Sequence, residues 1–168
     1  MKSFNQKVAA ITGAGSGIGQ QLAILLAQQG ADLALSDVND QGLAETLSLV
    51  KQYPVKVTLT KLDVSHQQAV REWAENSFKD HGKINLIFNN AGVALASTVE
   101  GMSYEEMEWI FNINFWGVVY GTKEFLPYLK QFFLSLSFAQ HQHQFLCFLA
   151  YVLSYAQRNP IYLMSFPC

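Results

Sequence analysis

The feature that most constrains the fold of this sequence is a glycine-rich turn after a short apolar run. Residues 8–12, Val-Ala-Ala-Ile-Thr, are the small and β-branched residues typical of a buried strand. The turn that follows contains four alternating glycines: Gly13, Gly15, Gly17 and Gly19. Apolar residues then return at helical spacing: Ile18, Leu22, Leu25 and Leu26. A strand that enters a helix through such a turn is typical of the first unit of a parallel α/β sheet.

Short apolar runs and helical stretches keep alternating as far as Lys130, which predicts a doubly wound parallel sheet. The further strands are expected at 32–36, 55–62 and 84–88. Helices are expected at 40–52, after a cap at Ser65 and up to His81-Gly82, after a capping box of Ser103 with Glu106, and at 112–130. We expect the strand order 3-2-1-4 in an incomplete Rossmann-type, three-layer αβα fold.

The glycine-rich turn also predicts a dinucleotide site. Glycines let the backbone approach a pyrophosphate, whose charge is stabilised by unpaired N–H groups at the positive end of the helix. The pattern is Thr-Gly-x-x-x-Gly-x-Gly, because Ile18 stands where Gly-x-Gly-x-x-Gly would need its third glycine. A tight turn without a ligand is the alternative, and four alternating glycines disfavour it. The candidate cofactor-binding residues are Thr12, Gly13, Gly15, Ser16, Gly17, Ile18 and Gly19.

Asp37 lies at the end of the second expected strand, beyond the turn. A carboxylate there can accept hydrogen bonds from both ribose hydroxyls of an adenosine, and it would repel a 2′-phosphate. The predicted cofactor is therefore NAD, preferred over NADP. The alternative is that Asp37 is a turn or capping aspartate, and Asp40 could be the cap instead.

Over residues 5–130 the sequence resembles the classical short-chain dehydrogenases/reductases. The resemblance depends on motifs that occur in order: the Thr12–Gly19 turn, Asp63-Val64, Asn89-Asn90-Ala91-Gly92, and Asn114 with Gly117. It implies an oxidoreductase that moves a hydride between a nicotinamide cofactor and an alcohol or ketone. Members commonly pair through the helix that matches 112–130, so a homo-oligomer is also implied.

The resemblance assigns roles to single residues. It implies that Asp63 and the Val64 backbone hold the adenine edge, and that Asn90, Ala91 and Gly92 form the floor beside the cofactor ribose. It further implies that the backbone of Asn114 holds a water in a proton relay. Without the family, the asparagines before Gly92 would indicate a polar turn, and Asn114 a local hydrogen-bonding residue.

The other catalytic residues of the family are not found in this chain. Its chemistry needs a tyrosine as general acid/base, a lysine four residues later, and a serine that orients the substrate. No lysine follows Lys130, and neither Tyr151 nor Tyr155 has a lysine four positions on. Ser137 and Ser154 lack the small-residue strand context of the family's serine. We therefore expect this chain alone not to be catalytically competent.

The composition changes abruptly after Lys130. Arg158 is the one charged residue beyond it, no glycine follows Gly121, and both cysteines, Cys147 and Cys168, lie in this part. The sequence thus divides into an NAD-binding segment, 1–130, and an aromatic, charge-poor tail, 131–168. One explanation is a reading frame lost near residue 130 of an ordinary dehydrogenase. The other is a genuine short form, a non-catalytic dinucleotide-binding module that docks on a partner through its aromatic tail.

Charge and composition limit the other partners. A net charge of −2 with scattered Lys and Arg argues against nucleic acid. The apolar run 145–156 is shorter than the roughly 20 residues that span a bilayer, so a membrane is not an expected partner. His141 and His143 lack a neighbouring carboxylate, and no metal is expected. Two cysteines and no apparent signal segment predict a cytoplasmic protein. The small alcohol or ketone is an expected partner only if the catalytic half is intact.

Overall fold

The computed structural model describes residues 4–136, in which strands and helices alternate along the chain. The elements are β1 (Val8–Thr12), α1 (Gly17–Gln28), β2 (Asp32–Asp37), α2 (Asp40–Val50), β3 (Val57–Lys61), α3 (Gln67–His81), β4 (Leu86–Phe88), α4 (Tyr104–Phe111), a π-helical turn η1 (Asn112–Trp116) and α5 (Gly117–Leu136).

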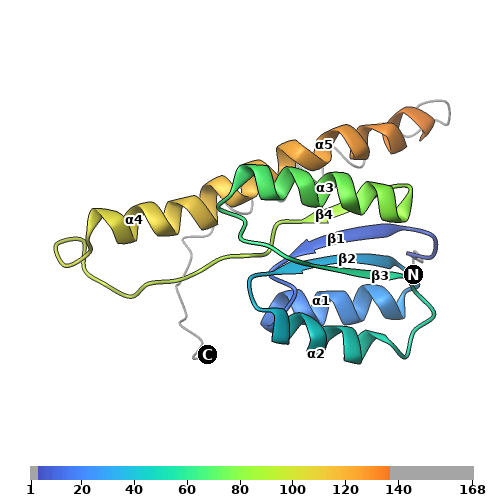
Figure 1. Ribbon diagram of the computed structural model, residues 1–168, viewed down its shortest axis with the longest axis horizontal. Helices are drawn as coiled ribbons and strands as arrows, with labels where there is room; N and C mark the ends of the chain where they lie inside the picture. The colour runs from blue at the N-terminus through green and yellow to red at the C-terminus, as the bar shows by residue number, and fades with distance from the viewer. Residues whose placement is uncertain (1–3, 137–168) are drawn as a thin grey trace. The chain divides into compact units, whose positions relative to one another are not determined.

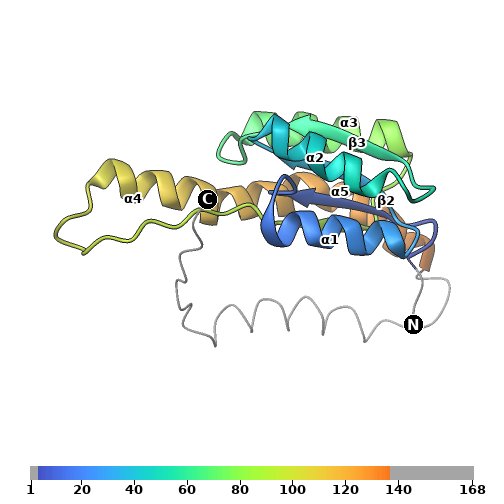
Figure 2. The same ribbon diagram turned by 90° about the horizontal axis from the view of Figure 1, so that it is seen from below.

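The strands form one parallel sheet in the order β3-β2-β1-β4, which confirms the predicted topology. Helices α1 and α2 cover one face of the sheet, and α3 and α5 cover the other (Figures 1 and 2). The described part is therefore a partial three-layer αβα fold of Rossmann type. Within it, β3 and β4 are the two edge strands.

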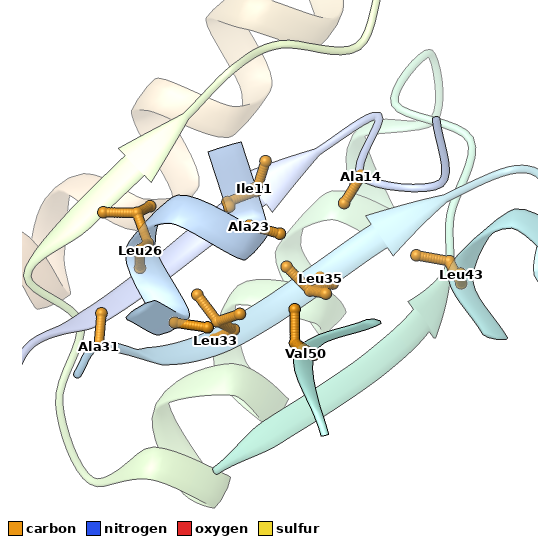
Figure 3. Packing of buried hydrophobic residues seen from close by; sticks show 11 residues of the cluster. Ile11, Ala14, Ala23, Leu26, Ala31, Leu33, Leu35, Leu43 and Val50 are labelled. Carbon is orange, nitrogen blue, oxygen red and sulfur yellow. The ribbon is translucent and has the colours of Figure 1, made fainter. Parts of the chain in front are cut away.

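β1 is buried along its whole length because it lies inside the sheet with helices on both faces. Ala9 and Ile11 pack toward α1 and α2, whereas Val8 and Ala10 pack toward α3 and α5. Figure 3 shows the first of these clusters. Its labelled members are Ile11, Ala14, Ala23, Leu26, Ala31, Leu33, Leu35, Leu43 and Val50. Ala14 belongs to the glycine-rich turn, so this core also packs against the turn.

The second cluster fixes α5 on the other face of the sheet. Trp73 of α3 and Phe125 of α5 meet edge to face, with ring centroids 4.8 Å apart, and Phe125 is completely buried. Phe78 and Tyr128 stack beside them at 4.7 Å. Burying one such aromatic side chain contributes about 2 kcal/mol. The apolar face of α5 is thus held by α3 as well as by the sheet.

Several predicted details are confirmed and others are wrong. Gly82 ends α3 in a left-handed conformation, with φ 73°, and the capping box of Ser103 and Glu106 starts α4. Ser65, however, does not cap α3. Its N–H and hydroxyl both donate to Asp63 Oδ1, at 2.9 and 2.7 Å, and His66 takes the N-cap position. The hydroxyl is therefore used in a turn closed by the preceding aspartate.

The helix expected at 112–130 does not begin at Asn112. It continues from α4 through η1 into α5 and ends at Leu136. The edge strands are also shorter than predicted, Val57–Lys61 and Leu86–Phe88, instead of 55–62 and 84–88. Before β4, the side-chain Oδ1 of Asn85 accepts the N–H of Val8 at 2.9 Å, and the backbone N–H of Asn85 donates to the Val8 oxygen at 3.0 Å.

His81 links the end of α3 to β3, and this contact predicts a pH dependence. Its Nε2 lies 3.0 Å from the Thr58 hydroxyl. Burial lowers the pKa of His81 below 6.5, and the positive charge of Lys56 lowers it further, against smaller opposite effects of Asp32 and Asp80. The unfolded chain therefore binds a proton at this site more readily than the folded chain does. The associated stability is complete above about pH 6.5 and is lost as the pH falls toward the folded-state pKa.

We expect the urea midpoint of the wild-type chain to fall between pH 7.5 and pH 5.5 by more than that of His81→Gln. Glutamine keeps a polar side chain that can reach Thr58 but has no titrating group. Urea unfolding followed by tryptophan fluorescence at the two pH values measures the difference. Equal pH dependence in the two proteins would contradict the prediction.

Candidate cofactor-binding site

The predicted site residues gather at the carboxyl edge of the sheet. The glycine-rich turn follows β1, Asp37 is the last residue of β2, Asp63 follows β3, and Asn90 follows β4. Because all four strands are parallel, these positions lie along one edge. In open α/β sheets this edge is where ligands bind.

Two glycines of the turn, Gly13 and Gly19, are required by close backbone approach. Gly13 has φ +67°, and a Cβ on it would lie 2.8 Å from Ala91 Cα. A Cβ on Gly19 would lie 2.0 Å from the carbonyl oxygen of Gly13. Ser16 precedes α1 in an extended conformation and makes no side-chain capping hydrogen bond. The positive end of α1 is therefore left to backbone N–H groups, which suits an anion.

Thr12 and Asn90 join the end of β4 to this turn. The Thr12 hydroxyl accepts the N–H groups of Asn90 and Ala91, each at 3.0 Å. The Asn90 side-chain Nδ2 donates to the carbonyl oxygens of Thr12 and Gly13, at 3.1 and 3.2 Å. The amide group of Asn90 is thus directed at the protein backbone, where it holds two loops together.

Asp37 presents a carboxylate whose two oxygens are both oriented by the backbone. Oδ2 accepts the N–H of Gly15 at 2.8 Å, and Oδ1 accepts the N–H of Asn39 at 2.9 Å. Asp37 therefore does close a turn, as the alternative from the sequence proposed, but it does not cap α2. That cap is Asn39, whose Oδ1 accepts the N–H of Gly42 at 3.1 Å. Each carboxylate oxygen keeps acceptor capacity for a ligand.

Asp63 and Val64 lie between β3 and α3, facing different partners. Asp63 accepts two hydrogen bonds from Ser65, and its Oδ2 lies 3.4 Å from His66 Nδ1. Val64 is buried, and Gly117 packs so closely on it that a Cβ there would lie 2.8 Å from Val64 Cγ2. The backbone at 63–64 is consequently held from both sides, by the Asp63 turn and by α5.

Asn114 lies inside the π-helical turn, which the sequence did not reveal. Its side chain exchanges two hydrogen bonds with the backbone of Val93, both at 2.8 Å. The side chain therefore joins the helix to the segment after β4, which is not a local hydrogen bond. Its backbone belongs to a turn in which the Gly117 N–H donates to the Asn112 oxygen. Such π turns occur frequently at functional sites.

Helix α2 also contributes to the site, and sequence reasoning missed it. A Cβ on Gly42 would lie 2.5 Å from the Gly15 oxygen, and the hydroxyl of Thr46 lies 2.8 Å from the Ala14 oxygen. Glycine inside a helix is unfavourable by about 1 kcal/mol relative to alanine, so Gly42 was a signal of a packing requirement.

Several residues that the sequence analysis considered, and did not assign to a site, lie outside the described residues. They are Ser137, His141, His143, Cys147, Tyr151, Ser154, Tyr155 and Cys168. Within residues 4–136, no three His, Cys, Asp or Glu side chains gather as metal ligands would. None of the helices in that same part is long and apolar enough to cross a membrane.

A parallel strand, a glycine-rich turn and an acidic residue at the end of the next strand define an α/β protein of Rossmann type. The sequence model of the short chain dehydrogenase family matches residues 7–133. The chain therefore belongs to the short-chain dehydrogenase/reductase family, and the matched residues correspond to the N-terminal part of such an enzyme.

Known relatives support this assignment. SadH of Mycobacterium tuberculosis is 44% identical over 129 residues, which are 77% of this chain and 47% of SadH. A CLA biosynthesis dehydrogenase/reductase of Lactiplantibacillus plantarum is 33% identical over 131 residues, 78% of this chain and 46% of the relative. The chain thus spans about half the length of the curated relatives it matches.

Solved structures give the same result. A short-chain dehydrogenase/reductase of Burkholderia phymatum in complex with NAD is 36% identical, with a TM-score of 0.73 over 77% of this chain and 46% of that chain. NAD⁺-bound xylitol dehydrogenase is 32% identical, with a TM-score of 0.73 over 76% of this chain and 50% of that chain.

Proposed function

We propose that residues 1–130 bind NAD, in preference to NADP, as the cofactor-binding part of an oxidoreductase that acts on an alcohol or ketone. The observation that carries the proposal is the Asp37 carboxylate, fixed by the N–H of Gly15 at the edge of the glycine-rich turn. The NAD complexes of related structures support a nicotinamide dinucleotide. When bound, the cofactor accepts or supplies the hydride.

Each part of the site has a distinct task in this proposal. Backbone N–H groups at the start of α1, from Ser16 to Gly19, bind the pyrophosphate, while Asp37 accepts hydrogen bonds from the adenosine ribose. Asp63 and the Val64 backbone border the adenine. Asn90, Ala91 and Gly92 form the floor beside the second ribose. The backbone of Asn114, inside its π-helical turn, holds a water for proton transfer.

The preference for NAD follows from charge. A 2′-phosphate would be repelled by Asp37 at short range. Lys61 lies beside Asp37 in the register of β2 and β3, yet its ammonium is 3.0 Å from the Asp40 carboxylate. The positive charge next to the proposed ribose site is therefore already balanced by an acidic residue, which supports NAD.

We further propose that 1–130 is the cofactor-binding segment, and that 131–168 is a tail with a separate origin. The sequence of the 168-residue chain contains no Tyr-x-x-x-Lys. This supports binding without turnover by this chain alone, either as a frameshifted dehydrogenase or as a short form that docks on a partner. Sequencing the source DNA across codon 130 and translating all three frames separates the two origins.

The decisive experiment is a titration of the purified, mass-verified chain with NADH, followed by fluorescence, and then an assay of hydride transfer with a panel of ketones. We expect saturable binding that AMP competes away, and no NADH consumption above the protein-free control. A folded chain that does not bind NADH would exclude the cofactor proposal. Hydride transfer above background would exclude the proposal that this chain is catalytically incompetent.

A further inference from the structure

The hydroxyl of Thr46, on α2, is buried against the glycine-rich turn. Thr46 is 0% exposed, and its Oγ1 lies 2.8 Å from the Ala14 oxygen and 3.0 Å from the Gly42 oxygen. Gln20 of α1 donates to the same Oγ1 at 3.0 Å. A hydroxyl has a single proton, and the shorter distance favours Ala14 as its acceptor. Thr46 thus connects two helices to the turn.

The peptide group between Ala14 and Gly15 is held at both of its polar atoms. Its carbonyl oxygen accepts the Thr46 hydroxyl, and its N–H donates to Asp37 Oδ2 at 2.8 Å. A peptide group is planar, so fixing the carbonyl also fixes the direction of the N–H. The buried hydroxyl of Thr46 therefore determines where the donor to Asp37 points.

Close packing of α2 makes this contact possible. The Cα of Gly42, one helical turn before Thr46, carries no side chain, and a Cβ there would lie 2.5 Å from the Gly15 oxygen. Because Gly42 lets α2 lie directly against the turn, the Thr46 hydroxyl reaches the backbone of Ala14. The two residues act on neighbouring carbonyl groups of the same turn.

We propose that Thr46 is a positioning residue that orients the Asp37 carboxylate through the Ala14–Gly15 peptide, and thereby raises the affinity for NAD and the selectivity against NADP. The proposal rests on the function proposed above, because the ribose is what Asp37 would recognise. Thr46 itself touches no part of the cofactor; it acts through the backbone.

The test compares Thr46→Val, Thr46→Ser and the matched control Ser48→Ala in the full chain. Valine keeps the shape of threonine and removes the donor, whereas serine keeps the hydroxyl. Ser48 lies on the same helix, exposed, and donates to its own helix at Ala44. We expect Thr46→Val to weaken NADH binding about tenfold, the effect of one lost buried hydrogen bond, and to reduce the ratio of NADPH to NADH dissociation constants. Thr46→Ser and Ser48→Ala should stay near wild type.

A second measurement follows the Gly15 amide directly. Hydrogen exchange of this N–H, observed by NMR without cofactor, should become about tenfold faster in Thr46→Val and remain unchanged in Ser48→Ala. Gln20→Ala removes the donor to the Thr46 hydroxyl from a half-buried position. We expect it to weaken NADH binding about threefold and to speed the exchange of the Gly15 N–H about threefold. This milder variant provides the test if valine at position 46 prevents folding.

The outcomes separate this inference from the proposed function. If the folded wild type does not bind NADH, the cofactor proposal fails, while Gly15 exchange still shows whether Thr46 orients the peptide. If NADH binds the wild type and neither affinity, selectivity nor Gly15 exchange responds to Thr46→Val or Gln20→Ala, the positioning role is overturned. The positioning role is also overturned if Thr46→Val and Thr46→Ser lose NADH affinity equally, because the hydroxyl would then not be the cause of the loss.

Discussion

Replacing Gly19 with alanine should destabilise the chain by about 3 kcal/mol or more and remove NADH binding, because the new Cβ has no space. It would lie 2.0 Å from the Gly13 oxygen and 2.6 Å from Asn90 Nδ2. Both neighbours belong to the network that joins β1 to β4, so neither can move without breaking the hydrogen bonds of Asn90. Urea unfolding and NADH fluorescence measure the two effects.

Gly17→Ala is the matched control for the stability measurement. Gly17 has φ +52°, which is unfavourable for alanine, but a Cβ there meets nothing within 4 Å. We therefore expect Gly17→Ala to lower the free energy of unfolding by about 1 kcal/mol, from backbone strain alone. We attribute the need for glycine at position 19 to the close packing of α1 on the turn, and not to backbone flexibility. Equal destabilisation by the two substitutions would contradict this explanation.

The element order could be predicted from the sequence because local patterns determine it, and the strand order followed from the topology that is typical of a doubly wound parallel sheet. Residues 8–12 form a continuous apolar run, and they occupy a strand buried on both faces. Glycines at Gly13 and Gly82 mark positions of positive φ, which other residues rarely adopt. Such signals lie within a few residues of the structure that they specify.

Features that depend on partners outside a helix could not be predicted. The π-helical turn at Asn112–Trp116 occurs where Gly117 packs against Val64 and Asn114 bonds Val93. Ser65 has the side chain of a good helix cap, yet Asp63 attracts its hydroxyl. In both cases a partner outside the helix competes with the pattern that the helix sequence follows.

The candidate site divides in the same way. The sequence identified Asp37 by type and position, but the two N–H groups that orient its carboxylate, those of Gly15 and Asn39, become visible only in the folded chain. Thr46 has no local signal of any role, because the oxygen it contacts belongs to Ala14 on a different segment. Sequence reasoning finds the groups that would meet a ligand more readily than the groups that hold them in place.

The charge of Asp37 should therefore determine both affinity and cofactor choice. In Asp37→Asn the side chain keeps its shape, but an NH₂ group replaces one of the two oxygens. Only one of the N–H groups of Gly15 and Asn39 then keeps its acceptor, and the charged acceptor for the ribose is lost. We expect NADH binding to weaken about 30-fold, the effect of losing charge-assisted hydrogen bonds. Binding of NADPH should not weaken in parallel, because the repulsion of its 2′-phosphate is removed at the same time.

Glu45→Gln is the matched control, since it removes the same charge from the exposed side of α2, where Glu45 accepts a hydrogen bond from Gln41. Fluorescence titrations of the wild type and both variants with NADH and NADPH at equal ionic strength give the ratio of dissociation constants. A lower NADPH-to-NADH ratio in Asp37→Asn alone would show that recognition depends on this carboxylate, and not on the net charge near the sheet edge. If the ratio of dissociation constants in Asp37→Asn equals that of the wild type, the selectivity for NADH does not depend on Asp37, and its proposed role at the ribose is contradicted.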